Sequence, residues 1–159
     1  MDLTKPYKVK LVSQTNAILL IAAALLFFFA EVLIFYPHGL KNQALSILVP
    51  VLHLALVIYL WQKFVTGKTE WAIDKTGVRI KWIKRFPLRN SGDYSFKWDE
   101  IESVRRGFYD PRYYTLKIEL DSGQTYAFYH GNSIVTDDFK AMLTTLYQTF
   151  EQTRNLQPT

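Results

Sequence analysis

Two long apolar segments near the amino terminus restrict this chain more than any other feature. They run from Ala17 to Tyr36 and from Ala44 to Phe64, and only the seven residues from Pro37 to Gln43 separate them. The first segment has twenty residues. As a helix it would be about 30 Å long, the thickness of the hydrocarbon core of a bilayer. The sequence therefore predicts a transmembrane helical hairpin over residues 1–65, with spans at about 17–36 and 44–64.

Two other structures for these segments fit the sequence less well. A cleaved signal peptide has an apolar stretch of about 7 to 15 residues followed by a small-residue cleavage site. Here the apolar run is longer, it ends in Phe-Tyr-Pro-His, and a second span follows at once. A buried helix pair would need more protein to cover it than the rest of the chain supplies. We therefore expect both segments to lie in lipid.

The basic residues beside the spans predict the orientation of the hairpin. Short flanks rich in Lys and Arg are retained on the cytoplasmic side of a membrane. We expect a multi-pass protein of the cell inner (cytoplasmic) membrane with both termini in the cytoplasm. Six lysines flank the pair of spans and one lies between them: Lys5, Lys8, Lys10, Lys63, Lys68 and Lys75 against Lys41.

Each span contains one ionisable residue away from its ends, Glu31 in the first and His53 in the second. A charge in hydrocarbon costs several kcal/mol unless it is neutralised, paired or close to an interface. In an antiparallel hairpin the depths of the two residues differ by roughly 6 Å, which side chains or a water can bridge. Two interpretations stay open, a neutral carboxyl group and a packed histidine without function, or a proton- or ion-linked pair.

The residues after the second span, 66–159, are predicted to form one soluble domain. Short runs of alternating apolar and polar residues, with turn residues between them, are typical of antiparallel strands. The clearest run has Leu116, Ile118 and Leu120 on one face and Lys117 and Glu119 on the other. The predicted strands are Glu70–Ile73, Val78–Ile83, Tyr94–Trp98, Ile101–Phe108, Tyr113–Leu120 and Thr125–His130, with a connection or short edge strand at Phe86–Leu88.

An amphipathic helix is predicted to close the soluble domain. It begins at Thr136 or Asp137, and apolar residues then recur at helical spacing along one stripe. These residues are Phe139, Leu143, Leu146 and Phe150. The fold class is therefore α+β, a transmembrane helical hairpin followed by an antiparallel sheet that a C-terminal amphipathic helix caps.

Three segments carry a recognisable order of strands and turns: Trp71–Val78, Trp98–Val104 and Leu116–Gly123. They resemble the bacterial pleckstrin-homology-like (PH-like) domains of small two-span membrane proteins, and the resemblance extends from Lys68 to about Arg154. It implies a partly open β-barrel or sandwich that the last helix plugs, and a role in docking rather than catalysis.

The wider fold also suggests one ligand. In its lipid-binding members a basic loop between the first two strands holds a phosphoinositide. Lys75, Arg79 and Lys81 have the matching order of charges here, but the turn has only four residues, Asp74 to Gly77. Such a turn is too short to surround an inositol phosphate.

A basic stretch is the main candidate for binding. Six basic residues and no acidic one lie between Lys75 and Arg89. The stretch begins about ten residues after the second span, where each Lys or Arg near an anionic leaflet contributes on the order of 1 kcal/mol. Trp82 is predicted to lie either in the membrane interface or in the core. An acidic protein partner and a plain solvated face are the alternatives. The candidates are Lys75, Arg79, Lys81, Trp82, Lys84, Arg85 and Arg89, extended by Arg105 and Arg106.

Other sites are less well supported by the sequence. The loop containing Tyr109 and Arg112 is predicted to contact a protein or to be a simple turn. Catalysis is not expected, because the chain has no phosphate-binding glycine loop, zinc-helix histidine pair or nucleophile elbow. With no cysteine there is no thiolate site, and we expect no cofactor or metal. The basic stretch has no recognition helix or stacking motif beside it, so nucleic acid is not an expected partner.

These observations predict a non-enzymatic integral membrane protein with a scaffold or assembly role. Its cytosolic PH-like domain would dock a partner protein, a second copy of the chain or the anionic headgroups of the lipid bilayer. The alternative is a subunit of a transporter or channel that uses Glu31 and His53.

Overall fold

The computed structural model describes residues 6–35, 43–87, 92–110, 113–131 and 137–155. Within it the chain divides into two compact units. The hairpin unit is Ser13–Thr66, and the sheet unit combines Met1–Val12 with Gly67–Thr159. The hairpin unit is thus an insertion within the sequence of the sheet unit.

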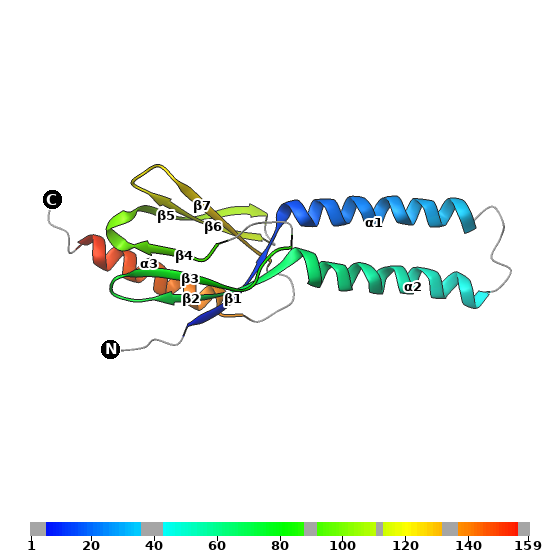
Figure 1. Ribbon diagram of the computed structural model, residues 1–159, viewed down its shortest axis with the longest axis horizontal. Coiled ribbons are helices and arrows are strands. Elements are labelled where there is room, and N and C mark those ends of the chain that lie inside the picture. The colour runs from blue at the N-terminus through cyan, green and yellow to red at the C-terminus, as the bar shows by residue number, and fades with distance from the viewer. Residues whose placement is uncertain (1–5, 36–42, 88–91, 111–112, 132–136, 156–159) are drawn as a thin grey trace. The chain divides into compact units, whose positions relative to one another are not determined.

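Two helices and a short π-helical turn make up the hairpin unit (Figure 1): α1 (Gln14–Phe35), α2 (Gln43–Leu60) and η1 (Trp61–Val65). The side-chain oxygen of Ser13 accepts a hydrogen bond from the Asn16 amide at 3.3 Å, which caps the first turn of α1. Because of this cap, α1 begins three residues before the predicted start of the first span. Both apolar segments are helical, and by length and composition both are able to cross a membrane.

Two contacts close the open end of the hairpin unit. The Ser13 amide donates to the carbonyl oxygen of Val65 at 2.9 Å, and the side-chain amide of Asn16 donates to the carbonyl oxygen of Phe64 at 2.8 Å. The residues that enter and leave the hairpin therefore lie side by side.

The sheet unit contains one seven-stranded sheet in the order β4-β3-β2-β1-β7-β6-β5. The six strands after the hairpin lie close to the predicted ranges, and Phe86 and Pro87 form a connection rather than a strand. The strands are β1 (Tyr7–Val12), β2 (Thr66–Ile73), β3 (Gly77–Lys84), β4 (Tyr94–Lys97), β5 (Ile101–Asp110), β6 (Tyr113–Leu120) and β7 (Thr125–Gly131).

Strand β1 is the main departure from the sequence-based prediction. We expected residues 1–65 to form the hairpin alone, but Tyr7–Val12 lies in the middle of the sheet, between β2 and β7. Val9 and Leu11 of this strand are 1% and 2% exposed. Their burial accounts for the placement, because they complete the apolar core that the later strands leave open. The turn at Asp74–Gly77 consequently joins the second and third strands, and the hairpin occupies the connection between the first two.

A single apolar core fills the sheet unit. Helix α3 (Phe139–Asn155) contributes Phe139, Met142, Leu143 and Leu146 to it, which confirms the predicted stripe and adds the methionine. The predicted alternation in β6 is confirmed where side chains are described, since Leu116 and Ile118 are fully buried and Lys117 is exposed. The helix itself begins two to three residues later than predicted.

Candidate functional sites

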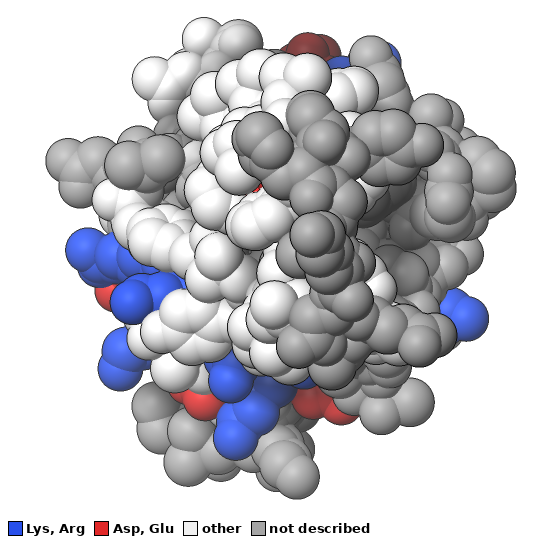
Figure 2. Space-filling view, turned by 90° about the vertical axis from the view of Figure 1, so that its right-hand side faces the viewer, with Lys and Arg blue, Asp and Glu red and all other residues white. Residues whose placement is uncertain are grey.

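The basic candidates do not gather on one surface. Strand β3 alternates, so that Val78, Ile80 and Trp82 are buried while Arg79 and Lys81 face outward. The eight residues of β3 span roughly 25 Å, and the turn that contains Lys75 lies at the opposite end of the strand from Lys84. The space-filling view shows Lys and Arg in separate groups with acidic side chains beside them (Figure 2).

Several of these basic side chains already face acidic groups. A guanidinium nitrogen of Arg79 lies 2.7 Å from a carboxylate oxygen of Asp74, and one of Arg85 lies 3.6 Å from Asp93. Arg105 lies 3.5 Å from Glu119, and Lys81 stands opposite Glu70 in the register of β2 and β3. Such exposed pairs contribute about 0–1 kcal/mol each, but they reduce the positive potential available to an external anion.

The remaining candidates of this group have different environments. Trp82 is only 9% exposed and packs in the core, which is one of the two positions predicted for it. Arg106 is exposed, and its charge acts on the hydroxyl group of Tyr147 in α3. Arg89, Arg112 and the side chain of Tyr109 lie outside the described residues.

A pair of lysines that the sequence did not suggest stands out in the register of the sheet. Lys68 of β2 is directly opposite Lys84 of β3, next to an irregularity in the pairing between Lys68 and Thr69. The register is the only signal that joins them, because they are sixteen positions apart in the sequence. In the sequence, Lys68 indicates only the orientation of the hairpin.

The structure brings together the two ionisable residues predicted in the interior of the spans. A carboxylate oxygen of Glu31 lies 3.1 Å from Nδ1 of His53, and their side chains are 17% and 14% exposed. The rings of Phe27 and Phe28 lie with their centroids 5.7 and 6.2 Å from that of His53. Both aromatic rings lie close to the imidazole of His53. The side chains of Glu31 and His53 meet directly, although the sequence predicts different depths for the two residues.

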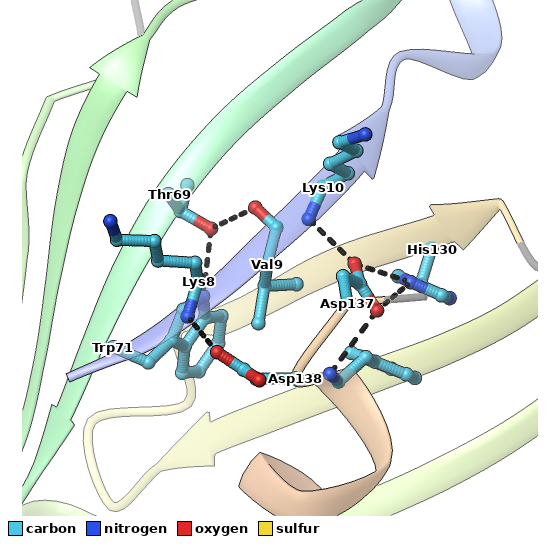
Figure 3. Close-up of polar contacts among 9 residues, drawn as sticks. Lys8, Val9, Lys10, Thr69, Trp71, His130, Asp137 and Asp138 are labelled. Carbon is cyan, nitrogen blue, oxygen red and sulfur yellow. Dashed lines mark hydrogen bonds and ion pairs between the residues drawn. The ribbon is translucent and has the colours of Figure 1, made fainter. Parts of the chain in front are cut away.

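A second polar cluster joins β1 to the start of α3 (Figure 3). The Asp137 carboxylate accepts hydrogen bonds from the amide of Lys10 at 2.9 Å, from the amide of Phe139 at 3.2 Å and from Nε2 of His130 at 2.9 Å. Asp138 accepts the amide of Lys8 at 2.9 Å. The His130 ring also stacks on Phe139, with centroids 4.0 Å apart.

The electrostatics of this cluster favour an ionised Asp137. Burial raises the pKa of its carboxyl group, but the hydrogen bond and charge of His130 and the amides of Lys10 and Phe139 outweigh burial and hold the pKa below its usual value. The sequence alone indicates no role for His130. Its partner Asp137 was predicted only as the start of a helix.

Two small hollows lie in the described surface. A groove of about 190 Å³ lies between the start of β5 and the end of α3, lined by Trp98, Asp99, Glu102, Asp121 and Arg154 among others. A second, of about 30 Å³, lies beside Leu11, Trp82 and Phe128. Typical small-molecule pockets have volumes of about 300–1,000 Å³. In the described ranges no group of three or more metal-ligating side chains is placed to hold an ion.

Comparisons with known proteins add little. No known family model matches this sequence, and no curated protein is significantly similar to it. Among solved structures, the complex of the FERM and C-terminal domains of Drosophila Merlin matches 54% of this chain, with 16% identity and a TM-score of 0.31. The match spans 25% of that chain. A similarity this weak carries no inference about fold or function.

Proposed function

We propose that this chain is a non-enzymatic integral membrane protein that holds a PH-like docking domain at the cytoplasmic surface of the cell inner membrane. The observation that carries the proposal is the insertion of the hairpin unit between β1 and β2, two neighbouring strands of one sheet. Segments of one sheet lie on one side of any membrane. The segment inserted between β1 and β2 must therefore cross the membrane an even number of times. Two spanning helices meet this requirement.

The surface of the hairpin unit supports a lipid environment. Large apolar side chains along both helices are exposed, among them Leu26 at 72%, Leu33 at 73% and Ile47 at 62%. Exposed apolar area costs roughly 25 cal/mol per Å² in water, and a patch of this extent marks a surface that something apolar covers. The six lysines outside the spans against one between them favour the cytoplasm for the sheet unit.

The strand order and the closing helix support the PH-like interpretation of the sheet unit. Seven strands precede α3, and α3 contributes its apolar stripe to their core, as expected for a barrel-like sheet plugged by its last helix. A domain of this kind with exposed, charged outer faces is suited to docking. The partners we propose are a protein, a second copy of the chain or the anionic membrane surface.

Membrane placement is tested by labelling single cysteines, since the natural chain has none. Lys41→Cys marks the segment between the spans, and Ser122→Cys marks the exposed turn between β6 and β7. A membrane-impermeant maleimide should label the first variant in intact spheroplasts and the second only after permeabilisation. Labelling of Ser122→Cys in intact spheroplasts would contradict the proposed topology.

The docking role is tested by copurification from solubilised membranes with quantitative mass spectrometry. Arg105→Glu/Arg106→Glu reverses the charge of two exposed residues on β5, and Lys140→Glu reverses that of an exposed residue on α3. An acidic protein partner at β5 should be lost from the double variant and retained by Lys140→Glu. If the unsubstituted chain, the double variant and Lys140→Glu all retain every copurifying protein equally, the β5 surface has no acidic protein partner.

A second candidate function is supported by the 3.1 Å contact between Glu31 and His53. An ionisable pair in a membrane-spanning helix pair is typical of proton or ion pathways, so we also consider a subunit of a transporter or channel. Ion flux into vesicles that contain the purified chain tests this role. Glu31→Gln should abolish the flux while Glu151→Gln, an exposed residue of α3, should not. Flux that Glu31→Gln leaves unchanged rules the role out.

A further inference from the structure

The Glu31–His53 pair lies among apolar side chains. Helices α1 and α2 contain three titratable side chains, those of Glu31, His53 and Tyr59. Tyr59 follows His53 by six residues, about 9 Å along the helix axis. Within the described helices, therefore, no further charged group is placed to balance a charge on this pair.

The side chains one helical turn from the pair carry no ligating atom. Residues three or four positions apart are neighbours on a helix surface. Around Glu31 these neighbours are three phenylalanines and an isoleucine, and around His53 they are two valines, a proline and a leucine. The pair thus presents one carboxylate and one imidazole nitrogen in an apolar setting.

A buried ring nitrogen of His53 is the atom that needs a hydrogen-bond partner. Its Nδ1 lies 3.1 Å from Oε2 of Glu31, but this nitrogen is buried and forms no hydrogen bond of good geometry. Buried polar atoms in proteins are nearly always hydrogen-bonded, because leaving one unpaired is costly. Since the two atoms are already within hydrogen-bond distance, a proton held between them supplies the missing bond.

Net charge limits the number of protons that the pair can hold. A net charge in hydrocarbon is strongly unfavourable. When Nε2 of His53 carries the ring proton, one further proton makes the pair neutral. The neutral pair is then either a carboxyl group beside a neutral imidazole or a carboxylate beside an imidazolium. Without that proton the net charge is negative, and with another it is positive.

Metal ions need more ligands than the pair provides. In proteins Zn²⁺ binds about four ligands, Mg²⁺ about six and Ca²⁺ about 6–8. A proton needs only one donor and one acceptor, which Glu31 and His53 supply. The number of polar groups at this position therefore points to a proton and not to a metal ion.

We propose that Glu31 and His53 together form a binding site for a single proton, held between Oε2 and Nδ1. The proposal rests on the proposed membrane placement and names the ion of the second candidate function. Within the site the proton passes from the carboxyl group to Nδ1. The O–H bond breaks and leaves its electron pair on the carboxylate, while the lone pair of Nδ1 forms the new N–H bond. The pair has no net charge before or after this step.

The test counts the protons on both side chains, using the full chain in phosphatidylcholine nanodiscs. Nitrogen-15 NMR of labelled histidine measures the proton occupancy of Nδ1 of His53, and infrared absorption by protonated carboxyl groups measures that of Glu31. Loss of each signal in His53→Gln or Glu31→Gln assigns it. We expect the two occupancies to sum to one proton between about pH 5 and pH 8, a range in which an ordinary histidine changes its charge.

Substitutions separate a shared proton from two independent groups. Glu31→Gln should leave Nδ1 of His53 without a proton at pH 7, because an imidazolium would then have no balancing charge. His53→Gln should keep Glu31 fully protonated for the same reason. Glu31→Asp retains the carboxyl group and should restore a total of one proton. Glu151→Gln, the matched loss of an exposed carboxylate of α3, should change neither signal.

Three results would overturn the inference. One is a total of zero or two protons on the pair at pH 7, and another is a proton on Nδ1 in Glu31→Gln as in the natural chain. The third is displacement of the proton by added Zn²⁺, which would assign the site to a metal ion. A chain that enters no disc would overturn the membrane placement and this inference with it. A total of one proton without proton flux into vesicles would support the site and exclude the transport role.

Discussion

Asp74 orders the turn between β2 and β3 through one carboxylate. The side chain accepts hydrogen bonds from the hydroxyl and amide of Thr76 and from the amide of Gly77, and it also contacts Arg79. The bonds from Thr76, together with those from Arg79 and Gly77, outweigh burial and lower the pKa of Asp74 from 3.8 to about 2. The sequence predicted this turn from its Asp and Gly, and the structure confirms it.

The lowered pKa of Asp74 predicts the direction of one pH effect. Because the folded-state value lies below the unfolded one, the stabilisation is complete above pH 4 and is lost as the pH falls towards about 2. Asp74→Asn should therefore lower the free energy of unfolding at pH 7 but have little effect near pH 2. Chemical denaturation of the detergent-solubilised chain at several pH values measures this. Asp121→Asn, at the start of the other tight turn, is the control.

Gly77 is required by a close approach of two strands. A Cβ atom at this position would lie against the carbonyl oxygen of Phe96 in β4, well inside contact distance, and 2.9 Å from the Cα atom of Lys97. Gly77→Ala must push β3 and β4 apart, and we expect it to lower the free energy of unfolding by about 2 kcal/mol or more. Gly92→Ala, where nothing lies within 4 Å, should change it by less than about 0.5 kcal/mol.

At the scale of elements, the residues just before α3 supply hydrogen-bond acceptors for backbone amides of β1. Strand β1 pairs with β7 at Leu11 and His130, and the amides of Lys8 and Lys10 bond to the carboxylates of Asp138 and Asp137. The two carboxylates therefore accept hydrogen bonds from β1 amides that a neighbouring strand would otherwise accept. This use explains why α3 begins after them and not at Thr136 or Asp137 as predicted.

Removing one of these carboxylates should loosen β1. Asp137→Asn deprives the Lys10 amide and the Nε2 of His130 of a charged acceptor, and we expect a loss of about 1–3 kcal/mol in the free energy of unfolding. Hydrogen exchange should accelerate first at the amides of residues 8–11. Glu151→Gln, on the exposed side of α3, is the matched loss of one charge. Equal protection of β1 in the two variants would contradict this account of the cluster.

The elements that sequence predicts well are those with local signals. Leu116, Ile118 and Lys117 alternate, and Gly123, with a φ of 79°, ends a turn that favours glycine. Strand β1 alternates too, with Val9 and Leu11 against Lys8 and Lys10, but its lysines also resemble the flank of a span and it leads directly into an apolar run. The pairing of Lys68 with Lys84 is hidden for another reason, since cross-strand register depends on the whole sheet.

At the scale of the whole molecule, the hairpin unit is an insertion that leaves the sheet continuous. Because Ser13 and Val65 are joined by a hydrogen bond, replacing residues 14–64 by Asn-Gly should close β1 and β2 into an ordinary hairpin. We expect this shortened chain to be soluble, monomeric and cooperatively folded. Circular dichroism, sedimentation and thermal unfolding measure the three properties.

The matched comparison is the chain of residues 66–159, which sequence reasoning would have taken as the complete soluble domain. It lacks Val9 and Leu11, which are almost fully buried in the core, and it exposes the edges of β2 and β7. We expect it to aggregate or to unfold at a much lower temperature than the shortened chain that retains β1. If the two unfold at the same temperature, β1 is not part of the cooperative sheet.

The position of β1 has a consequence for biosynthesis. This strand is made before the other strands of its sheet, and its partner residue His130 is made 119 residues after Leu11. At about 5–20 residues per second, translation of that interval takes roughly 6–24 s. Strand β2 is available to pair with Tyr7–Val12 once residue 73 has been made, but the pairing of β1 with β7 waits for the whole interval. The sheet therefore closes only after both apolar helices have been made, and its first strand must stay available for β7 throughout the synthesis of the inserted hairpin unit.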